Sequence, residues 1–550
     1  MSTRAPAAPA TSAAPYGGTT LAGTATLLRF ALRRDRVRLP VWVAALTAGT
    51  ALTALSFRDL YPDAAARRTA AASVSSPAGL ALSGPERYLA DYTYGAMLGH
   101  QMLSFTAVLL ALFTVLTVTR HSRAEEESGR AELVRSAAVG RYAPLAVALG
   151  VALIACLAVG AALTLALGAQ GVPDVGWGGS LLYGAAHAAT GLVFAAVAAL
   201  TGQLTAHARG ASGMAFAVLG LAYLLRAAGD MGSGALSWLS PIGWAQRTYV
   251  YLDDRWWPLL LSAAATAVLL AGAVTLSNRR DLGAGLRPAR GGPPRASAAL
   301  THPLGLAWRL HRGLLLGFAV ALLVFGASYG GVLADAEEMV RDVEVLQDAL
   351  ARLGGVSVTE SFAAMVLVVM VVVAAVYVVI AALRPRAEES GRRAEPLLAT
   401  ALSRTRWLGG HLAVALAGGT LLLLLAGLAF GLVGAAVTGD GGLVPELTGA
   451  ALAYAPALWV TAGVACLLYG WLPRAVTLTW VVPLLGFVVS YLGPLLQLPD
   501  WLTYVSPFSH VPHLPAEPLT WTPLVVLTLL AGALLALGLA GFRRRDLETA

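Results

Sequence analysis

The feature that most constrains this chain is a series of long apolar runs that continues from one end of the sequence to the other. Of its 550 residues, 57% are hydrophobic and only 12% are charged. The hydrocarbon core of a bilayer is about 30 Å thick, so a helix needs about 20 apolar residues to cross it. The sequence therefore predicts an all-helical membrane protein that crosses the bilayer many times.

The apolar runs form two groups of six, which predicts twelve transmembrane helices. They lie near residues 40–57, 95–119, 143–169, 180–202, 211–229 and 258–277, and near 313–333, 362–383, 411–437, 447–470, 475–494 and 522–541. Each group has an even number of crossings, so both have the same orientation. We expect two parallel repeats related by an axis along the membrane normal, with a pathway between them.

Composition divides the chain into four segments. Residues 1–21 are rich in Ala, Pro and Thr, which predicts a disordered tail without the apolar core of a secretory signal. Residues 279–300 are rich in Gly, Pro and Arg, as is typical of a flexible linker. The two six-helix halves are then residues 22–278 and 301–550.

Arginine is concentrated in alternate loops, and it supplies all 38 basic residues. The loops at 120–142 and 384–410 are rich in Arg, whereas the loop at 334–352 is mostly acidic. By the positive-inside rule, we expect the Arg-rich loops, the linker and both termini in the cytoplasm. Exclusive use of Arg with abundant Ala is typical of a GC-rich bacterial genome, which favours the bacterial plasma membrane.

The residue content argues against several functional classes. A chain without Lys has no G-x-x-x-x-G-K-[ST] loop for nucleotide phosphates, so we do not expect it to hydrolyse ATP itself. No pair of nucleophile and base recurs at a useful spacing, so an enzyme is not expected. The Arg clusters flank apolar runs instead of forming a basic domain, so nucleic acid is not an expected partner.

Metal binding is not expected either. Cys156 and Cys466 both lie within apolar runs, which favours a packing role. His510 and His513 lie in a proline-rich segment without regular helical geometry. We therefore predict no metal site and no cofactor in this chain.

A charged phrase occurs once in each half, in the loop between the second and third crossings. It reads RAEEESGR at 123–130 and RAEESGR at 386–392. Glutamate precedes arginine by four residues in both copies, an arrangement that predicts a short surface helix with Glu126–Arg130 and Glu388–Arg392 pairs.

Each predicted surface helix contains a glycine, Gly129 or Gly391. A glycine inside a helix costs about 1 kcal/mol relative to alanine, but it is useful where another backbone comes close. The alternative is a solvated charged turn that a duplication copied. Its occurrence at equivalent places in both halves favours a functional role.

A second repeated phrase follows the last crossing of each half. Arg279-Arg280-Asp281-Leu282 follows the sixth crossing, and Arg544-Arg545-Asp546-Leu547 follows the twelfth. The two halves therefore resemble each other beyond their number of helices.

An amphipathic stretch precedes each half and predicts a helix in the membrane interface. The first is LLRFALRRDRVRLP at 27–40, whose charged face carries Arg29, Arg33 and Arg36. The second is LAWRLHR at 306–312, which carries Trp308 and Arg309. The alternative is an Arg-rich flank that only fixes orientation.

The order of these parts resembles that of the type-2 permeases of ATP-binding-cassette exporters, in particular the duplicated actinobacterial permeases described as polyketide-antibiotic exporters and tetronasin-resistance proteins. The resemblance covers about residues 22–547 and is carried by RAEEESGRAELV at 123–134 and RAEESGRRAEPLL at 386–398. It implies an elbow helix at the start of each half. It also implies that each charged loop is a cytoplasmic coupling helix that docks on an ATPase subunit.

The resemblance implies two copies of a separate nucleotide-binding ATPase, which would hold ATP and magnesium. The coupling residues carried over are Arg123, Glu125, Glu126, Glu127, Ser128, Gly129 and Arg130 in the first half, and Arg386, Glu388, Glu389, Ser390, Gly391 and Arg392 in the second. The second copy lacks one Glu and gains Arg393, so the two docking sites need not be equivalent. The implied activity is export of a hydrophobic or amphipathic drug or antibiotic, although the sequence equally allows a lipid; the substrate-binding residues are unknown.

The alternative from a different class is a proton-coupled secondary drug transporter with twelve helices. Such a transporter usually needs a relay of carboxylates or histidines inside the membrane. Here His100 and His187 lie within crossings, and a lone histidine is more often a packing residue. A membrane scaffold without transport would leave the repeated loop unexplained.

Overall fold

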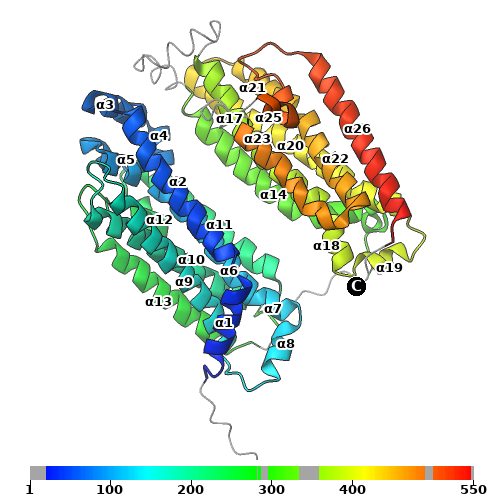
Figure 1. Cartoon of the computed structure of the whole chain (residues 1–550), viewed down its shortest axis with the longest axis horizontal. Helices are drawn as coiled ribbons and strands as arrows, with labels where there is room; N and C mark the ends of the chain where they lie inside the picture. Colours follow the sequence, from blue (N-terminus) through cyan, green and yellow to red (C-terminus); the bar gives the residue numbers. More distant parts are fainter. Residues whose placement is uncertain (1–19, 281–282, 287–294, 334–357, 490–499, 547–550) are drawn as a thin grey trace, which may run out of the picture. The chain divides into compact units, whose positions relative to one another are not determined.

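The computed structural model describes residues 20–280, 283–286, 295–333, 358–489 and 500–546. All regular structure in these ranges is helical. The chain divides into two compact units, Met1–Arg290 and Gly291–Ala550, each a bundle of helices (Figure 1). Residues 1–19 of the predicted disordered tail and residues 281–282 and 287–294 of the predicted linker lie outside the described residues.

The described part of the first unit contains thirteen α-helices and two short 3-10 helices. Its α-helices are α1 Thr24–Arg34, α2 Arg38–Leu60, α3 Ala64–Ser73, α4 Pro77–Ser83, α5 Tyr94–Gln101, α6 Leu103–His121, α7 Arg123–Glu127, α8 Arg130–Arg135, α9 Ala143–Ala169, α10 Trp177–Leu204, α11 Ala208–Asp230, α12 Pro241–Gln246 and α13 Pro258–Ser277. The 3-10 helices are Glu86–Asp91 and Leu236–Leu239.

The described part of the second unit begins with a 3-10 helix, Ala298–Thr301. Its α-helices are α14 Pro303–Gly330, α17 Val358–Ala382, α18 Arg384–Ser390, α19 Ala394–Leu398, α20 Arg404–Thr438, α21 Leu443–Ala453, α22 Ala455–Trp471, α23 Val481–Phe487, α25 Asp500–Val505 and α26 Trp521–Arg544. Further 3-10 helices span Pro473–Trp480 and Pro507–His510.

Eleven helices in the described residues are long and apolar enough to cross a membrane. They are α2, α6 continued by α7, α9, α10, α11, α13, α14, α17 continued by α18, α20, α21 continued by α22, and α26. The crossing expected at 475–494 corresponds only to the shorter apolar stretch Pro473–Phe487, and its last residues lie outside the described ranges. These helices make the chain a multi-pass membrane protein. The described residues contain eleven spans of full length, whereas twelve crossings were predicted.

The core of the first unit is built around α10. This helix packs against α6, α9, α11 and α13, and most of its residues are buried. Small residues allow close approach to α9, since a Cβ added to Gly184 would overlap the backbone of Gly160. Such small-residue contacts are common between helices in membranes, where van der Waals packing replaces the hydrophobic effect.

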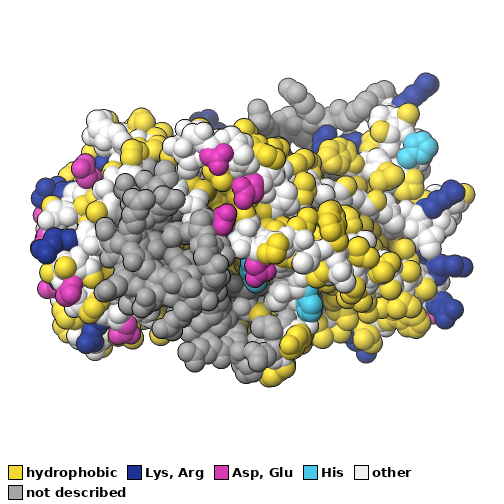
Figure 2. Space-filling model, turned by 90° about the horizontal axis from the view of Figure 1, so that it is seen from above, with side chains coloured by type: hydrophobic (Ala, Val, Ile, Leu, Met, Phe, Trp, Pro, Cys, Tyr) yellow, Lys and Arg dark blue, Asp and Glu magenta, His cyan; other side chains and the backbone are white. Residues whose placement is uncertain are grey.

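The second unit has a comparable core around α22, which packs against α17, α20 and α26. A Cβ added to Gly470 would overlap the backbone of Gly538 in α26. The outward faces of both units carry many exposed Leu, Val and Trp side chains, and hydrophobic side chains cover wide areas of the described surface (Figure 2). Exposed apolar surface of this extent is what a lipid-facing protein requires.

The first amphipathic stretch forms a separate helix, α1, that packs on α9 through Ala31, Val147 and Val151. Asp35 follows the last residue of α1 and is buried. Its carboxylate forms an ion pair with Arg120 at 2.8 Å and contacts the His121 ring at 2.6 Å. This buried carboxylate fixes the corner between α1 and α2. The basic residues Arg29, Arg33 and Arg36 are exposed, and Arg36 lies in the turn after α1.

The second amphipathic stretch does not form a helix of its own. Trp308 and Arg309 lie inside α14, which runs without a break from Pro303 to Gly330, so the prediction of a second separate elbow helix is wrong. The physical reason is that Pro40 disfavours a continuous helix through the residues before it in the first stretch, whereas residues 304–330 contain no proline. A 3-10 helix of four residues, Ala298–Thr301, is what precedes α14 among the described residues.

Candidate functional site

The first charged loop forms two short helices, α7 and α8, joined by a tight turn at one end of the first unit (Figure 1). Gly129, in the turn, has a φ of 75°. This left-handed conformation costs residues other than glycine about 1–2 kcal/mol. A Cβ added to Gly129 would meet no atom within 4 Å. Among the described residues, the turn conformation and not a close neighbour therefore explains this glycine.

The second charged loop has the same plan with its turn shifted by one residue. Helices α18 and α19 flank Gly391, Arg392 and Arg393. Here Arg392 has the positive φ, 56°, whereas Gly391 has an ordinary φ of −85°. The second loop thus places a bulky residue in the conformation that the first loop gives to glycine.

The predicted i, i+4 pairs in the loops are wrong. Glu126 pairs with Arg123 and Arg280, and Arg130 instead lies 3.8 Å from Glu125. Glu388 pairs with Arg384 at 2.8 Å and Arg393 at 2.6 Å. The reason is the turn, because a break in the helix separates each glutamate from the arginine four residues later.

Arg123 anchors the start of the first loop inside the protein. Its side chain is 1% exposed. It donates hydrogen bonds to Glu126 at 2.7 Å and to the carbonyl oxygens of Gly202 and Ala284 at 2.8 and 3.1 Å. Helix α7 is therefore tied to the end of α10 and to the segment that follows α13.

Arg280 completes this attachment from the other side. Its guanidinium donates to both carboxylate oxygens of Glu126, each at 2.8 Å, and its Nε donates to Gln203 at the end of α10 at 2.6 Å. Bidentate arginine–carboxylate pairs are among the strongest and most directional polar contacts in proteins. Glu126 is thus held between two arginines.

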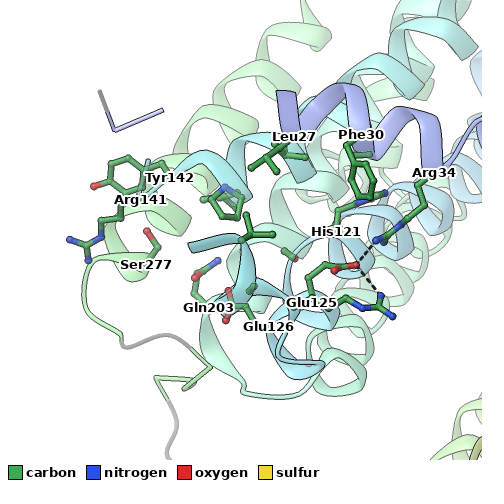
Figure 3. A pocket seen from close by; sticks show the side chains of 18 of the residues that line it. Leu27, Phe30, Arg34, His121, Glu125, Glu126, Arg141, Tyr142, Gln203 and Ser277 are labelled. Carbon is green, nitrogen blue, oxygen red and sulfur yellow. Dashed lines mark ion pairs between the residues drawn. The ribbon is translucent and has the colours of Figure 1, made fainter. Parts of the chain in front are cut away.

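The two neighbouring glutamates contact two further helices. Glu125 pairs with Arg34 of α1 at 2.7 Å (Figure 3). Glu127 accepts a hydrogen bond from the backbone N–H of Ala208, the first residue of α11, at 2.9 Å. A carboxylate there satisfies a free N–H group and suits the helix dipole. Of the three consecutive acids, Glu125 therefore contacts α1 and Glu127 contacts α11. Glu126 is connected through Arg280 to the ends of α10 and α13.

In the second unit, Glu389 occupies the position that Glu126 has in the first. Arg545 donates to both of its carboxylate oxygens at 2.6 and 2.9 Å, and the Tyr469 hydroxyl near the end of α22 donates at 2.7 Å. Arg386 lies 3.9 Å away, as the counterpart of Arg123. In both units, therefore, a glutamate of the charged loop is held by an arginine that follows the last transmembrane helix.

The two phrases repeated in the sequence thus meet in the structure. Arg280 and Arg545 are both the second arginine of an RRDL phrase, and each clamps the second glutamate of its RAEE phrase. The two pairs have similar sequence separations, 154 and 156 residues. Sequence reasoning missed these arginines, although their occurrence at matching places in both halves was a usable signal.

The predicted coupling residues therefore separate into two groups. Arg123, Glu388 and Glu389 are buried, and Glu125 and Glu126 are half-buried, so their side chains fix the loops internally. The exposed members are Glu127, Ser128 and Arg130 in the first loop and Ser390, Gly391 and Arg392 in the second. Contacts with another protein would come from the exposed group.

A cavity of about 380 Å³ lies beside the first loop (Figure 3). It is enclosed by α1, α7, α8, the start of α9 and the ends of α6, α10 and α13. Its lining combines apolar residues, such as Leu27 and Leu145, with charged ones, such as Arg34 and Glu125. This mixed lining suits an amphipathic ligand.

The histidines inside the first bundle have local hydrogen-bond partners. His187 contacts the Thr106 hydroxyl at 2.6 Å and the Tyr183 carbonyl at 2.8 Å. His100 contacts the Tyr92 hydroxyl at 3.0 Å and the Gly84 carbonyl at 3.1 Å. Both ring nitrogens of each histidine are engaged, as expected for packing residues.

The fold defines a polytopic helical membrane protein, and sequence comparison places the chain in a family. The family described as "Multidrug efflux system permease Rv1217c, C-terminal domain" matches residues 25–276 and 300–543. The chain belongs to this family.

A full-length relative is known in Mycobacterium tuberculosis (strain ATCC 25618 / H37Rv). It is the "Multidrug efflux system permease protein Rv1217c", which is 44% identical over 549 residues. The alignment covers 98% of each chain. The likeness thus extends over both units and is not confined to the charged loops.

The arginine clamps should hold the charged loops in place. We expect Arg280→Met and Arg545→Met each to weaken the local structure by about 3 kcal/mol, because each leaves a largely buried glutamate without its bidentate partner. Hydrogen–deuterium exchange should then be faster in α7–α8 for the first variant and in α18–α19 for the second. The exposed neighbours Arg279→Met and Arg544→Met are matched controls, and equal exchange in a variant and its control would contradict the clamp.

The left-handed residues should respond in opposite ways in the two loops. We expect Gly129→Ala to destabilise its turn by about 1 kcal/mol, because alanine is strained at positive φ, and Arg392→Gly to stabilise the second turn by a similar amount. Gly391→Ala should have a smaller effect, since Gly391 has an ordinary φ and an added Cβ would only displace the Arg393 guanidinium. Thermal unfolding in detergent measures all three; a loss of stability in Arg392→Gly would refute this account.

Proposed function

We propose that this chain is the permease subunit of an ATP-driven multidrug exporter of the type-2 ATP-binding-cassette class. Its relationship to a multidrug efflux permease over the full length supports a role in drug efflux. The observation that carries the ATP-driven mechanism is the pair of short charged loops, each tied by an arginine to the end of a transmembrane helix. Such a fixed loop is suited to transmitting movement between a docked partner and the bundle.

The proposed partner is a separate ATPase subunit, present in two copies and holding ATP and magnesium. One copy would contact the first loop at Ser128, Gly129 and Arg130, and the other the second loop at Ser390, Gly391 and Arg392. These residues lie in the turns between the short helices or at the adjoining helix ends, since Arg130 begins α8 and Ser390 ends α18. The clamped glutamates would act as positioning residues, because their carboxylates are already bound inside the permease.

ATP-driven movement of a docked subunit would reach the bundle through the clamps. In the first unit, a displacement of α7 acts directly on α10 and α13 through Arg123 and Arg280, and on α1 through Glu125. In the second, α18 acts on α22 and on the end of α26 through Glu389. Alternation of the bundle between inward and outward states would follow from these movements.

The proposed topology has twelve crossings, with α1 lying in the interface and both termini in the cytoplasm. The stretch Pro473–Phe487 would belong to the crossing that matches α11 of the first half; residues 490–494 of that expected crossing lie outside the described residues. The Arg-rich loops and the final arginines support a cytoplasmic location for the charged loops in a bacterial plasma membrane.

The proposed cargo is a hydrophobic or amphipathic small molecule, such as an antibiotic. The buried faces of the spans are dominated by Ala, Leu, Val and Gly, which offer apolar contact but few fixed charges.

Bulky residues at the exposed turns should prevent binding of the ATPase. We expect the double variant Ser128→Trp/Ser390→Trp to lose the co-purifying ATPase, because tryptophan at these positions blocks the turn while every clamp stays intact. The measurement is a pull-down of the tagged permease from its native membrane with the ATPase quantified, and wild type should carry about two copies.

Ser75→Trp is the matched control for this pull-down. Ser75 is exposed at the opposite end of the first unit, and its hydroxyl donates to a carbonyl three residues earlier, as that of Ser128 does. The control should retain the ATPase. If the wild-type permease itself carries none, the proposal fails and a proton-coupled transporter becomes the better account.

A further inference from the structure

The cavity beside the first charged loop has the lining expected of a lipid site. We propose that it binds an anionic phospholipid from the bilayer, with the phosphate at an arginine rim and part of one acyl chain on an apolar wall. At about 380 Å³ it is at the lower end of the size range of ligand pockets, so it would hold a headgroup and the first part of a chain. This site is independent of any ATPase.

The apolar wall comes from three helices. Leu27 and Phe30 project from α1, Val134 from α8, and Leu145 and Val147 from the first turns of α9. Phe30 is 64% exposed, although it is large and apolar. Covering this wall with hydrocarbon removes apolar surface from water, which stabilises the complex.

The rim of the cavity is positively charged. Four arginines line it, Arg34, Arg130, Arg141 and Arg280, against the two acids Glu125 and Glu126. Arg34 and Arg280 are already engaged by these glutamates at 2.7 and 2.8 Å. The lining therefore has two more arginines than acids. This excess of positive charge favours an anionic headgroup over a zwitterionic one.

Arg130 is the arginine best placed to contact the phosphate. Its side chain is 67% exposed, and among the described residues the acid that it pairs with, Glu125, is 3.8 Å away, at the outer limit of an ion pair. Arg141, at the other side of the cavity, donates a 3.3 Å hydrogen bond to the Asn278 carbonyl. Because the Glu125 carboxylate is this distant, the Arg130 guanidinium can turn toward a ligand phosphate at little cost.

The position of the cavity identifies the source of the ligand. Helices α6, α10 and α13 end at the cavity and α9 begins there, so it lies at one surface of the membrane. Lipid headgroups are present at this level at high local concentration. A free phosphate ion would satisfy the rim but would leave the apolar wall uncovered, so the lipid is the better occupant.

A bound lipid would contact both α1 and α8, and so would connect the helix that precedes the first span to the charged loop. The second unit offers no equivalent wall in its described residues, because α14 is continuous and has no separate helix before it except a four-residue 3-10 helix. Arg392, the counterpart of Arg130 in the second charged loop, therefore provides a matched control.

The test measures lipid retained by the full-length permease, purified alone. The protein is equilibrated with equal amounts of phosphatidylglycerol and phosphatidylcholine in detergent, repurified, and its lipid quantified by mass spectrometry. Wild type should retain phosphatidylglycerol preferentially. Arg130→Ala should lower this retention about fivefold, the contribution of one arginine near an anionic lipid. Arg392→Ala should not.

A second variant separates the cavity from general surface charge. Ala131 is buried and lines the cavity, so Ala131→Phe fills the space and keeps every arginine. It should also lose phosphatidylglycerol. A photoactivatable phosphatidylglycerol on wild-type protein, which needs no variant to fold, should crosslink to peptides within residues 27–34 or 130–147.

Three results would overturn the proposal. They are equal retention of the two lipids by wild type, full retention by Ala131→Phe with crosslinks outside these peptides, and displacement of the lipid by inorganic phosphate alone at comparable concentration. The last result would indicate a site for free anions. Because no ATPase is present, none of these results depends on the proposed coupling mechanism.

Discussion

The bilayer sets the constraint on which this structure depends: within its hydrocarbon core, no water is available to satisfy a polar group. The spans are therefore helical and apolar, and the charged residues of the loops gather at helix ends. There a glutamate that turns toward the protein needs an arginine as partner. Helices α7 and α18 have only five and seven residues, too few to be stable alone. They continue the spans α6 and α17, and their arginine partners hold their far ends against the other helices of each unit.

Part of this arrangement could be predicted from the sequence. Apolar runs of 18 residues or more predicted most of the spans, because their length is dictated by bilayer thickness. The repeated phrase predicted two charged helical loops at matching places. The exception is the run at 475–494, whose described part is a 3-10 helix followed by the short helix α23. Apolar content alone does not distinguish such a segment from a continuous span.

The partners of the glutamates could not be predicted from spacing. The i, i+4 rule applies inside a continuous helix, and the turns at Gly129 and Arg392 break both loops. The clamping arginines are more than 150 residues away, so only the fold brings them together. The continuity of α14 could not be predicted from the sequence pattern either, because the start of α14 has the same amphipathic character as α1. The first stretch differs in a proline, Pro40, which lies in the first turn of α2, and in a buried acid, Asp35, at the corner of the first unit.

The loops differ in detail although they share a plan. Glu127 ties the first loop to α11, and the second loop has one glutamate fewer and an arginine at the left-handed position. In a homodimer, any substitution alters both sites at once, so the two faces of the assembly stay identical. A single chain that carries both loops encodes them separately. Each loop can therefore change independently, and a mutation that weakens one leaves the other unchanged. The cavity walled by α1 has no equivalent wall among the described residues of the second unit, and a homodimer could not carry such a feature on one side alone.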